Sequence, residues 1–405
     1  MRSAQVLALC AVALTCGPPQ AQAVDDPPVE AQSVVLMDAA DGTVLYERAA
    51  RVSRYPASLT KILTAILVIE EGELDEIVTV GKRPAAVGES SISLADGEQI
   101  PLEHLLQAIL IKSANDAASA AGEHLAGSVD AFVDVMNRRA RELGATGTHF
   151  TNPHGLHDPD HYTTAYDLAV LTRHAMGLER FRELVATTRA TIPWPGHKWD
   201  RVLINRNELL GKYPGVNGVK TGYTRAAGRC IVLSAKQGHL SIIGVLLKTE
   251  HLWRDARAFL DWALARFERV RLVRAGGTAA YVSVANGRHA QVRAVAAEDI
   301  WATVPREEVG RARLEFTRPT LAAPVAKGQP AGSVEVRLAD GRTLSTGLVA
   351  AREVRLTVWA WTLRHWSLAA LSLVILFLAL WLPWYASRKR WPRQAVGRGG
   401  SVRRS

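Results

Sequence analysis

Twenty consecutive residues near the end of the chain, from Trp366 to Tyr385, contain no charged side chain. At ~1.5 Å rise per residue, a helix of this length crosses the ~30 Å hydrocarbon core of a bilayer. Aromatic residues of the kind that anchor a helix at both membrane surfaces flank it: Trp359, Trp361, Trp366, Trp381, Trp384 and Tyr385. We therefore predict one membrane-spanning helix over 366–385, with the lipid bilayer as a partner.

The residues after this segment are strongly basic. The last 18 residues hold seven Lys and Arg and no acid, out of a net charge of +10 for all 405 residues. Positive flanks stay in the cytoplasm, so we expect 386–405 to be a cytoplasmic tail. Residues 3–387 carry a net charge of only +2, which argues against nucleic acid as a partner, because such proteins spread basic charge over the folded part.

The first 23 residues have the three parts of a secretory signal peptide. Arg2 is followed by an apolar stretch from Val6 to Thr15 and by the small-residue cleavage pattern Ala21-Gln22-Ala23. Removal of residues 1–23 leaves Cys230 as the one cysteine, so no internal disulfide is expected. Together with the C-terminal span, this signal predicts that the body of the protein lies outside the cytoplasm.

The body divides by its hydrophobic patterns into two regions. In residues 31–268, apolar or amphipathic segments predict helices over 58–69, 102–111, 129–143 and 251–267. Strands are predicted over 33–37, 44–47, 219–221, 230–235 and 240–248. From 270 to 352, short alternating segments separated by turn dipeptides predict a small all-β domain. The fold class is thus α+β, a helical cluster packed on an antiparallel sheet, followed by a β domain and a membrane helix.

A serine and a lysine stand one turn apart at the start of the most apolar predicted helix. Pro56 indicates a helix start, which places Ser58 in the first turn and Lys61 on the same face. A serine hydroxyl becomes a nucleophile when a base takes its proton. Burial in an apolar helix lowers the pKa of a lysine toward a value useful for that base. Alone, the pattern Ser-x-x-Lys is weak, because it occurs often by chance.

Two further motifs follow in a fixed order. Ser113-Ala114-Asn115 ends an apolar helix and offers a hydroxyl that can relay a proton and an amide that can bind a peptide carbonyl. Lys220-Thr221-Gly222 lies on a predicted strand, where the lysine and threonine can hold a carboxylate and the glycine admits a substrate backbone. Each tripeptide alone has an ordinary structural explanation. The ordered set is typical of penicillin-binding proteins and serine β-lactamases.

With these motifs, residues 31–352 resemble the D-alanyl-D-alanine carboxypeptidases, the low-molecular-mass penicillin-binding proteins. The resemblance includes Pro56 to Lys61, Thr151-Asn152-Pro153-His154-Gly155-Leu156, His161 to Ala165, and Gly218 to Gly222. It implies a transpeptidase-like fold related to serine β-lactamases, no cofactor and no metal. The substrate would be a peptidoglycan stem peptide ending in D-Ala-D-Ala, and β-lactam antibiotics would act as acylating inhibitors.

The resemblance also implies how the acyl-enzyme forms. Ser58 would attack the carbonyl between the two terminal D-alanines, with Lys61 as the base. The backbone N–H groups of Ser58 and Tyr223 would form the oxyanion hole.

The other motif residues would bind the substrate and the leaving group. Ser113 and Lys220 would relay a proton to the departing D-alanine, and Asn115 would orient the acyl chain. Lys220 and Thr221 would bind the terminal carboxylate beside Gly222. Water would then release a tetrapeptide, which would regulate cross-linking of the cell wall. The site would face the periplasm from the inner membrane.

Two positions depart from the family's usual residues, and the anchor departs as well. Asn217 stands where Asp is common, and Tyr223 stands where His is common. Position 223 would contribute only its backbone, so we expect activity to persist. Many relatives have a surface-lying amphipathic anchor, whereas this segment is long enough to span.

Four other functions compete with the carboxypeptidase. A β-lactamase shares the motifs, but the Glu-x-x-Leu-Asn segment of class A is absent from the sequence. A zinc hydrolase is suggested by a cluster of ligand residue types, although no His-Glu-x-x-His motif is present: His154, His157, Asp158, Asp160 and His161. An inactive peptidoglycan-binding scaffold would not need all the motif residues. A penicillin-sensitive D,D-endopeptidase would use the same residues and stays open.

Overall fold

The computed structural model describes residues 26–277 and 279–388. The predicted signal peptide (1–23) and nearly all of the predicted tail (386–405) lie outside these residues. The chain forms two compact units. The first comprises Met1–Val270 with Trp301–Ala312, and the second comprises Arg271–Ile300 with Arg313–Ser405.

A five-stranded antiparallel sheet lies at the centre of the first unit, in the order β2-β1-β9-β8-β7. Its strands are β1 (Ser33–Asp38), β2 (Val44–Arg48), β7 (Val216–Thr224), β8 (Gly228–Gln237) and β9 (Leu240–Thr249). All five include a segment predicted from the sequence, and β8 and β9 are joined by a turn at Gly238, where φ is +59°. The continuous apolar runs of β8 and β9 arise because both faces of the sheet are covered.

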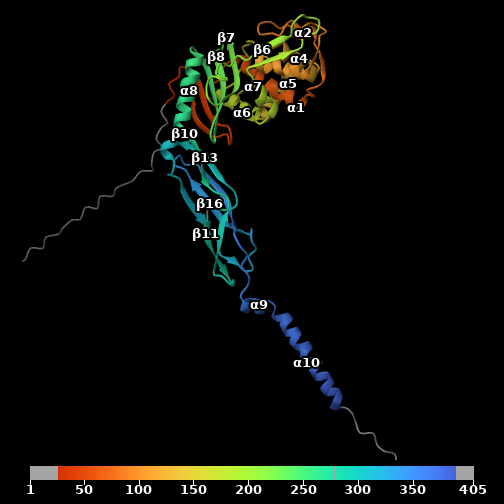
Figure 1. Ribbon diagram of the computed structural model, residues 1–405, viewed down its shortest axis with the longest axis vertical. Coiled ribbons are helices and arrows are strands. Elements are labelled where there is room, and N and C mark those ends of the chain that lie inside the picture. The colour runs from red at the N-terminus through yellow and green to blue at the C-terminus, as the bar shows by residue number, and fades with distance from the viewer. Residues whose placement is uncertain (1–25, 278, 389–405) are drawn as a thin grey trace, which may run out of the picture. The chain divides into compact units, whose positions relative to one another are not determined.

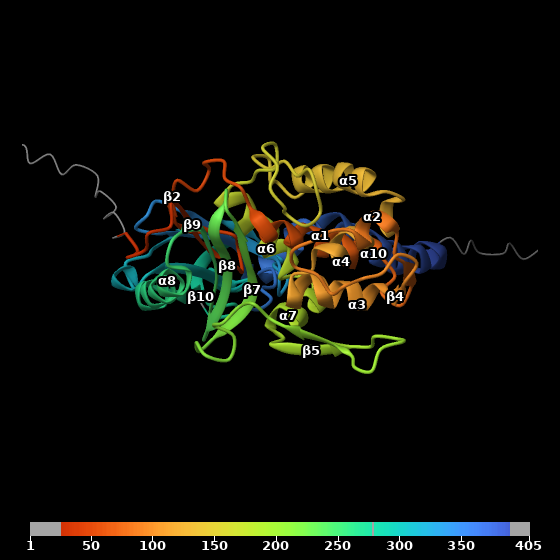
Figure 2. The ribbon, with the colours of Figure 1, turned by 90° about the horizontal axis from the view of Figure 1, so that it is seen from above.

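Helices cover the two faces unequally, as Figure 2 shows for β7 and β8, with α8 on one side and α1, α4 and α6 on the other. Side chains alternate accordingly: Val35 and Met37 belong to the core of the helical cluster, whereas Val34 and Leu36 pack on the α8 side. The α-helices are α1 (Lys61–Glu71), α2 (Lys82–Ala85), α3 (Leu102–Gln107), α4 (Asn115–Ala126), α5 (Val129–Glu142), α6 (Ala165–Ala175), α7 (Glu179–Ala186) and α8 (Leu252–Arg266).

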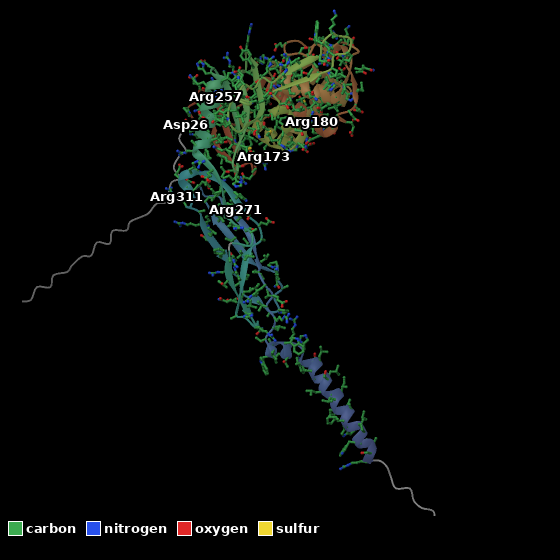
Figure 3. The ribbon with its side chains drawn as sticks, in the orientation of Figure 1. Asp26, Arg173, Arg180, Arg257, Arg271 and Arg311 are labelled. Carbon is green, nitrogen blue, oxygen red and sulfur yellow. The ribbon has the colours of Figure 1, made fainter. Side chains whose placement is uncertain are left out.

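Arginines on the surface tie helices of the cluster to their neighbours (Figure 3). Arg173 of α6 donates to the carbonyl oxygens of Ala39 and Ala40, beyond the end of β1, at 3.3 and 3.4 Å. Arg180 of α7 forms an ion pair with Glu103 of α3. These half-exposed pairs contribute little to stability individually, and the apolar core holds the cluster together.

Two short two-stranded sheets also belong to the first unit and were not predicted from the sequence. They pair β3 (Ile77–Thr79) with β4 (Gln99–Pro101), and β5 (Arg189–Ile192) with β6 (Arg201–Ile204). Arg201 helps to hold the β5–β6 pair, whose Ile192 and Leu203 are buried in the core. Its buried guanidinium donates to Glu98 at 2.6 and 2.8 Å and to the carbonyl oxygen of Ile92 at 2.7 Å.

Residues Trp301–Ala312 return to the first unit, although the sequence placed all of 270–352 in the β domain. The reason is a buried polar contact, in which the Thr303 hydroxyl and the Arg269 guanidinium both donate to Asp38 at the end of β1. The strands here are β10 (Phe267–Val273) and β13 (Ile300–Pro305), which form a two-stranded sheet, followed by the 3₁₀ turn η3 (Arg306–Glu308).

The second unit contains a six-stranded sheet in the order β14-β16-β17-β12-β11-β15. Its strands are β11 (Ala279–Ala285), β12 (Gln291–Ala296), β14 (Arg313–Thr317), β15 (Leu321–Ala322), β16 (Pro330–Arg337) and β17 (Thr343–Ala350). Exposed and buried residues alternate strictly along β11, as the sequence pattern predicts for a sheet with one solvated face. The predicted β domain is therefore present.

Two helices end the described chain: α9 (Val358–Arg364) and α10 (Trp366–Arg388) (Figure 1). The mean hydropathy of the most apolar 18-residue window of α10 is 2.1, and α10 is the helix of the described residues that is long and apolar enough to cross a membrane. None of its residues is buried in the protein. A terminal apolar helix that fits a membrane anchor is thus present where the sequence predicted one.

Candidate active site

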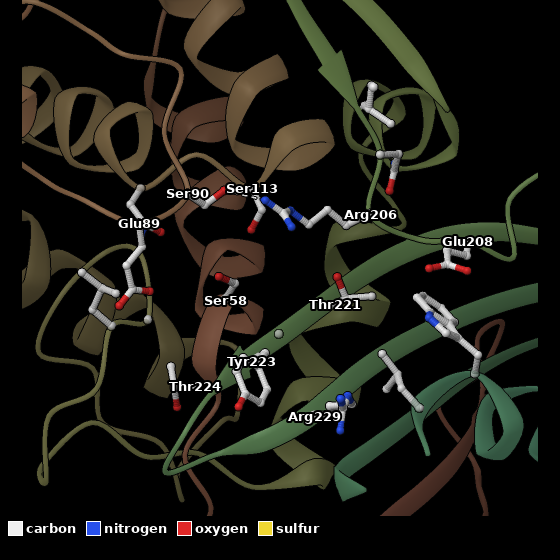
Figure 4. Close-up of a pocket in the computed structure, with 18 residues that line it drawn as sticks. Ser58, Glu89, Ser90, Ser113, Arg206, Glu208, Thr221, Tyr223, Thr224 and Arg229 are labelled. Atoms are coloured by element: carbon white, nitrogen blue, oxygen red, sulfur yellow. Dashed lines mark hydrogen bonds between the residues drawn. The ribbon is translucent and has the colours of Figure 1, made fainter. Parts of the chain in front are cut away.

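The three sequence motifs meet at one cleft of about 690 Å³ in the first unit. Figure 4 shows Ser58, Ser113 and Thr221 around it, from three separate parts of the chain. The residues that line it are Ser58, Glu89, Ser90, Ser113, Asn115, Gly155, Leu156, Ile204, Asn205, Arg206, Glu208, Thr221, Gly222, Tyr223, Thr224, Arg229, Leu252 and Trp253. The two motif lysines, Lys61 and Lys220, are buried with 0% and 3% of their surfaces exposed.

Ser58 lies in a 3₁₀ turn, η1 (Ala57–Thr60), directly before α1, instead of within one continuous helix over 58–69. Ala57 starts this turn with φ of +50°. The spacing still places Lys61 Nζ 3.1 Å from Ser58 Oγ. Lys61 also donates to Asn115 Oδ1 and to the carbonyl oxygen of His154, each at 2.7 Å.

All three partners of the Lys61 amine are uncharged, and this governs its proton affinity. Burial away from water lowers the pKa of Lys61 well below 10.5, and the positive charge of Lys220 lowers it further. The carboxylates of Asp116 and Glu89 oppose this shift but do not cancel it. A lowered pKa is what the sequence-based interpretation of Lys61 as a base requires.

Ser113 and Asn115 are positioned by an unusual end to the preceding helix. α3 continues as one π turn, η2 (Ala108–Lys112), and Ser113 then adopts a left-handed conformation with φ of +69°. The π turn and the positive φ were not predicted, and both are typical of functional sites. The Asn115 amide donates to Gly88 O at 3.0 Å, which leaves its Oδ1 to accept from Lys61.

The third motif lies along β7, beside the start of α1. Gly222 has no Cβ, and one placed there would lie 3.0 Å from Pro56 O and 3.1 Å from Ser58 N. Glycine is thus needed for the strand to approach the nucleophile closely. Burial lowers the pKa of Lys220 to about 7, with a further contribution from the positive charge of Arg206. The side chain of Tyr223 is 61% exposed.

Sequence reasoning missed the charged residues that line the cleft, Glu89, Arg206, Glu208 and Arg229, and the buried Asp116. Arg206 lines the cleft 3.5 Å from Ser90 Oγ and adds a positive charge near Lys220. Asp116 is fully buried and accepts hydrogen bonds from Ser91 Oγ at 2.6 Å and from the backbone N–H of Leu94 at 3.1 Å, which fixes the loop between α2 and β4 next to the site. An acid directly after the second motif was the available signal for Asp116.

The histidine-rich segment that suggested a zinc site is held by hydrogen bonds within the protein. His161 Nε2 lies 2.8 Å from Thr60 Oγ1, and its Nδ1 accepts from the backbone N–H of Thr151 at 3.0 Å. Burial lowers the pKa of His154 and of His161 to about 3, so both rings are neutral. Within the described residues, the His, Asp and Glu atoms close enough together to hold a metal belong to Glu30, Glu250 and His251, which are exposed.

A serine next to a buried, desolvated lysine, with a strand glycine beside the serine backbone, defines the class of serine acyl-transfer enzymes that use a lysine base. The model of the D-alanyl-D-alanine carboxypeptidase family matches residues 20–251, and that of the penicillin-binding protein 5 C-terminal domain matches residues 267–355. The chain belongs to the D-alanyl-D-alanine carboxypeptidase family and is a serine hydrolase. The predicted family, fold class and enzyme class are confirmed.

Relatives cover most of both domains. D-alanyl-D-alanine carboxypeptidase DacF of Bacillus subtilis is 34% identical over 336 residues, which is 80% of this chain and 85% of the relative. DacC of Escherichia coli is 34% identical over 347 residues, covering 80% and 84%. Among solved structures, penicillin-binding protein 5 of Haemophilus influenzae matches with a TM-score of 0.66 at 30% identity, covering 82% of this chain and 99% of that one.

Proposed function

We propose that this enzyme removes the terminal D-alanine from peptidoglycan stem pentapeptides through an ester on Ser58. The observation that carries the proposal is the Lys61 amine, which contacts Ser58 and Asn115 while fully buried and without a carboxylate partner. Two relatives, DacF and DacC, are named D-alanyl-D-alanine carboxypeptidases, and these names supply the substrate class.

The first step transfers a proton from Ser58 to Lys61. A neutral amine has two N–H bonds and one lone pair. The two N–H bonds donate to Asn115 Oδ1 and His154 O, so the lone pair faces Ser58 Oγ and accepts the hydroxyl proton. Ser58 Oγ then bonds to the carbonyl carbon between the two D-alanines, and the carbonyl oxygen becomes an oxyanion.

The oxyanion is stabilised by the backbone N–H groups of Ser58 and Tyr223. Both flank Gly222, whose missing Cβ leaves the space beside Ser58 N open. Fixed donors of this kind are already oriented before the charge develops, so little reorganisation is needed in the transition state.

Collapse of the tetrahedral intermediate breaks the peptide bond and needs a proton on the departing amine. Lys61 gives up the proton taken from Ser58, and Ser113 with Lys220 relays it to the amine of the leaving D-alanine, which leaves Lys61 neutral again. With a pKa of about 7, Lys220 is partly protonated at neutral pH and can also bind the terminal carboxylate together with Thr221. Arg206 adds positive charge near that carboxylate. Water then attacks the ester, with Lys61 again as base, and frees the tetrapeptide.

We also propose that the enzyme is a single-pass protein of the inner membrane, with the first unit in the periplasm and the C-terminus in the cytoplasm. The apolar helix α10 supports the anchor. The basic residues that follow it in the sequence support the orientation.

The test is to treat the full chain, in mild detergent, with a fluorescent penicillin and to measure intact mass for the wild type and Ser58→Ala. D-Alanine release from a pentapeptide is followed in parallel. An adduct that is absent from the variant, together with D-alanine release, supports the proposal. An adduct without release would favour the D,D-endopeptidase, steady turnover of the penicillin would favour a β-lactamase, and no adduct on folded protein would favour the scaffold.

A further inference from the structure

A second cavity, of about 590 Å³, lies in the second unit at the point where the chain enters α9. It is lined by Arg288, Pro324, Arg355, Leu356, Val358, Trp361, Arg364 and His365. Three of these eight residues are arginines, one is a histidine, and none is an acid. The cavity is therefore both basic and partly apolar, and no part of the catalytic machinery contributes to it.

The backbone around this cavity is fixed by hydrogen bonds. The N–H of Thr357 donates to Asn286 O at 2.9 Å, and the N–H of Arg288 donates to Arg355 O at 2.8 Å. These bonds join the turn between β11 and β12 to the segment that leads into α9. Thr357 also caps α9 by accepting from the N–H of Ala360 at 3.2 Å. The walls are thus held in place without a ligand.

The charges that face this cavity are largely uncompensated. Within residues 279–388, the ion pair at the cavity joins Arg355 to Glu353 at 2.9 Å, and both of those side chains are well exposed. No carboxylate of this range lies within ion-pair distance of Arg288 or Arg364. An anion that can bind two guanidinium groups at once would complement this arrangement.

The exposed apolar side chains of α9, the helix that forms one wall of the cavity, indicate that the anion belongs to a lipid. Val358, Trp359 and Leu363 of α9 are 70%, 73% and 56% exposed, which is unfavourable in water for a helix of seven residues. His365 directly precedes Trp366, the first residue of α10. When α10 spans the bilayer, this cavity lies at the depth of the headgroups, where tryptophan and arginine side chains are favoured.

We propose that this cavity binds the headgroup of an anionic phospholipid, with the phosphate held between Arg288 and Arg364 and the acyl chains beside α10. The inference rests on the membrane anchoring proposed above. A phosphodiester offers the oxygens that guanidinium groups bind in pairs. The stacked rings of Trp361 and His365, with centroids 4.7 Å apart, form an apolar and polarisable wall for the glycerol part.

Native mass spectrometry on the full chain in neutral detergent tests this proposal. The wild type, Arg288→Gln/Arg364→Gln and a control, Arg313→Gln/Arg318→Gln, are each titrated with phosphatidylglycerol and with phosphatidylcholine. The control removes the same charge from exposed positions of the same unit. An arginine near a lipid surface is worth about fivefold in affinity, so we expect roughly 25-fold weaker phosphatidylglycerol binding in the cavity variant and no change in the control.

Three results would overturn the proposal. They are equal affinity of the wild type for the two lipids, equal loss in the cavity and control variants, and full displacement of the lipid by inorganic phosphate, which would make the ligand a soluble anion. Penicillin acylation, measured on the same samples, separates this inference from the proposed activity. Failure of the activity removes the adduct from every sample, whereas failure of the lipid site leaves the adduct unchanged.

Discussion

The two units of this enzyme differ in what they bury. Every polar or charged side chain that is buried among the described residues belongs to the first unit, including Lys61, Asp116 and Lys220. The described core of the second unit consists of apolar side chains such as Val334, Val336 and Leu348. Burying a polar group costs free energy unless it is hydrogen-bonded. The buried polar groups of the first unit therefore reflect the requirements of the reaction as well as those of stability.

The comparison predicts that changes in the first unit alter activity more than folding, and that changes in the second unit do the reverse. The largest effect is expected for Ser58→Ala. Loss of the nucleophile should lower the rate of D-alanine release at least ~10⁴-fold, with little change in stability, because the hydroxyl lines an open cleft. Kinetics with a pentapeptide and a thermal melt check both parts. Residual activity near wild type would place the nucleophile elsewhere.

Lys220→Met should lower the activity and raise the stability at neutral pH. We expect kcat/KM to fall about 10²-fold, since a charged hydrogen bond to the substrate carboxylate is lost. The pKa of Lys220 is lowered to about 7 when folded, so between about pH 7 and 10.5 the unfolded chain binds more protons than the folded one. Wild-type stability should therefore rise with pH across this window, and the variant should have a smaller slope, to which Lys61, whose pKa is also lowered, still contributes.

Urea unfolding of both proteins at several pH values measures this slope. The variant should also be more stable than the wild type at neutral pH, by about 1–3 kcal/mol, because methionine carries no charge to desolvate. A variant that is less stable, with the wild-type slope intact, would contradict the assignment of the lowered pKa to Lys220.

A smaller effect is expected at position 223. Tyr223 is 61% exposed and is proposed to contribute its backbone, so Tyr223→His should change the rate of penicillin acylation by less than about threefold. Gly222→Ala is the matched control on the same strand, because its Cβ would lie 3.0 Å from Pro56 O. Stopped-flow acylation compares the two variants, and similar rates for both would contradict the backbone role.

The smallest effect on activity is expected from Leu348→Ala in the second unit. Leu348 is fully buried, so the substitution should destabilise that unit by about 2–5 kcal/mol and leave the acylation rate unchanged. Hydrogen exchange of β16 and β17 measures the loss, with the half-exposed Leu314→Ala as control. An equal drop in acylation would show that the two units do not differ as described.

The sequence predicts the central sheet, the β domain and the motif residues, because these depend on local patterns. It does not predict the π turn before Ser113, because backbone strain of this kind is imposed by tertiary packing. Lys61 contacts Asn115 and His154, which are 54 and 93 positions away from it in the sequence. These contacts and the role of Arg206 likewise depend on distant segments. The return of Trp301–Ala312 to the first unit depends on one buried acid, Asp38, which no local pattern reveals.

The missing side chain at Gly222 has a consequence for how this gene can vary. Two adjacent positions on β7 are constrained differently. Position 222 must leave space beside Ser58 N, whereas the side chain at position 223 points into solvent. In a library randomised at 222 and 223 and sorted for penicillin labelling, we expect the survivors to carry glycine at the first codon and a broad mixture at the second. The constraint at position 222 thus comes from the absence of a side-chain atom.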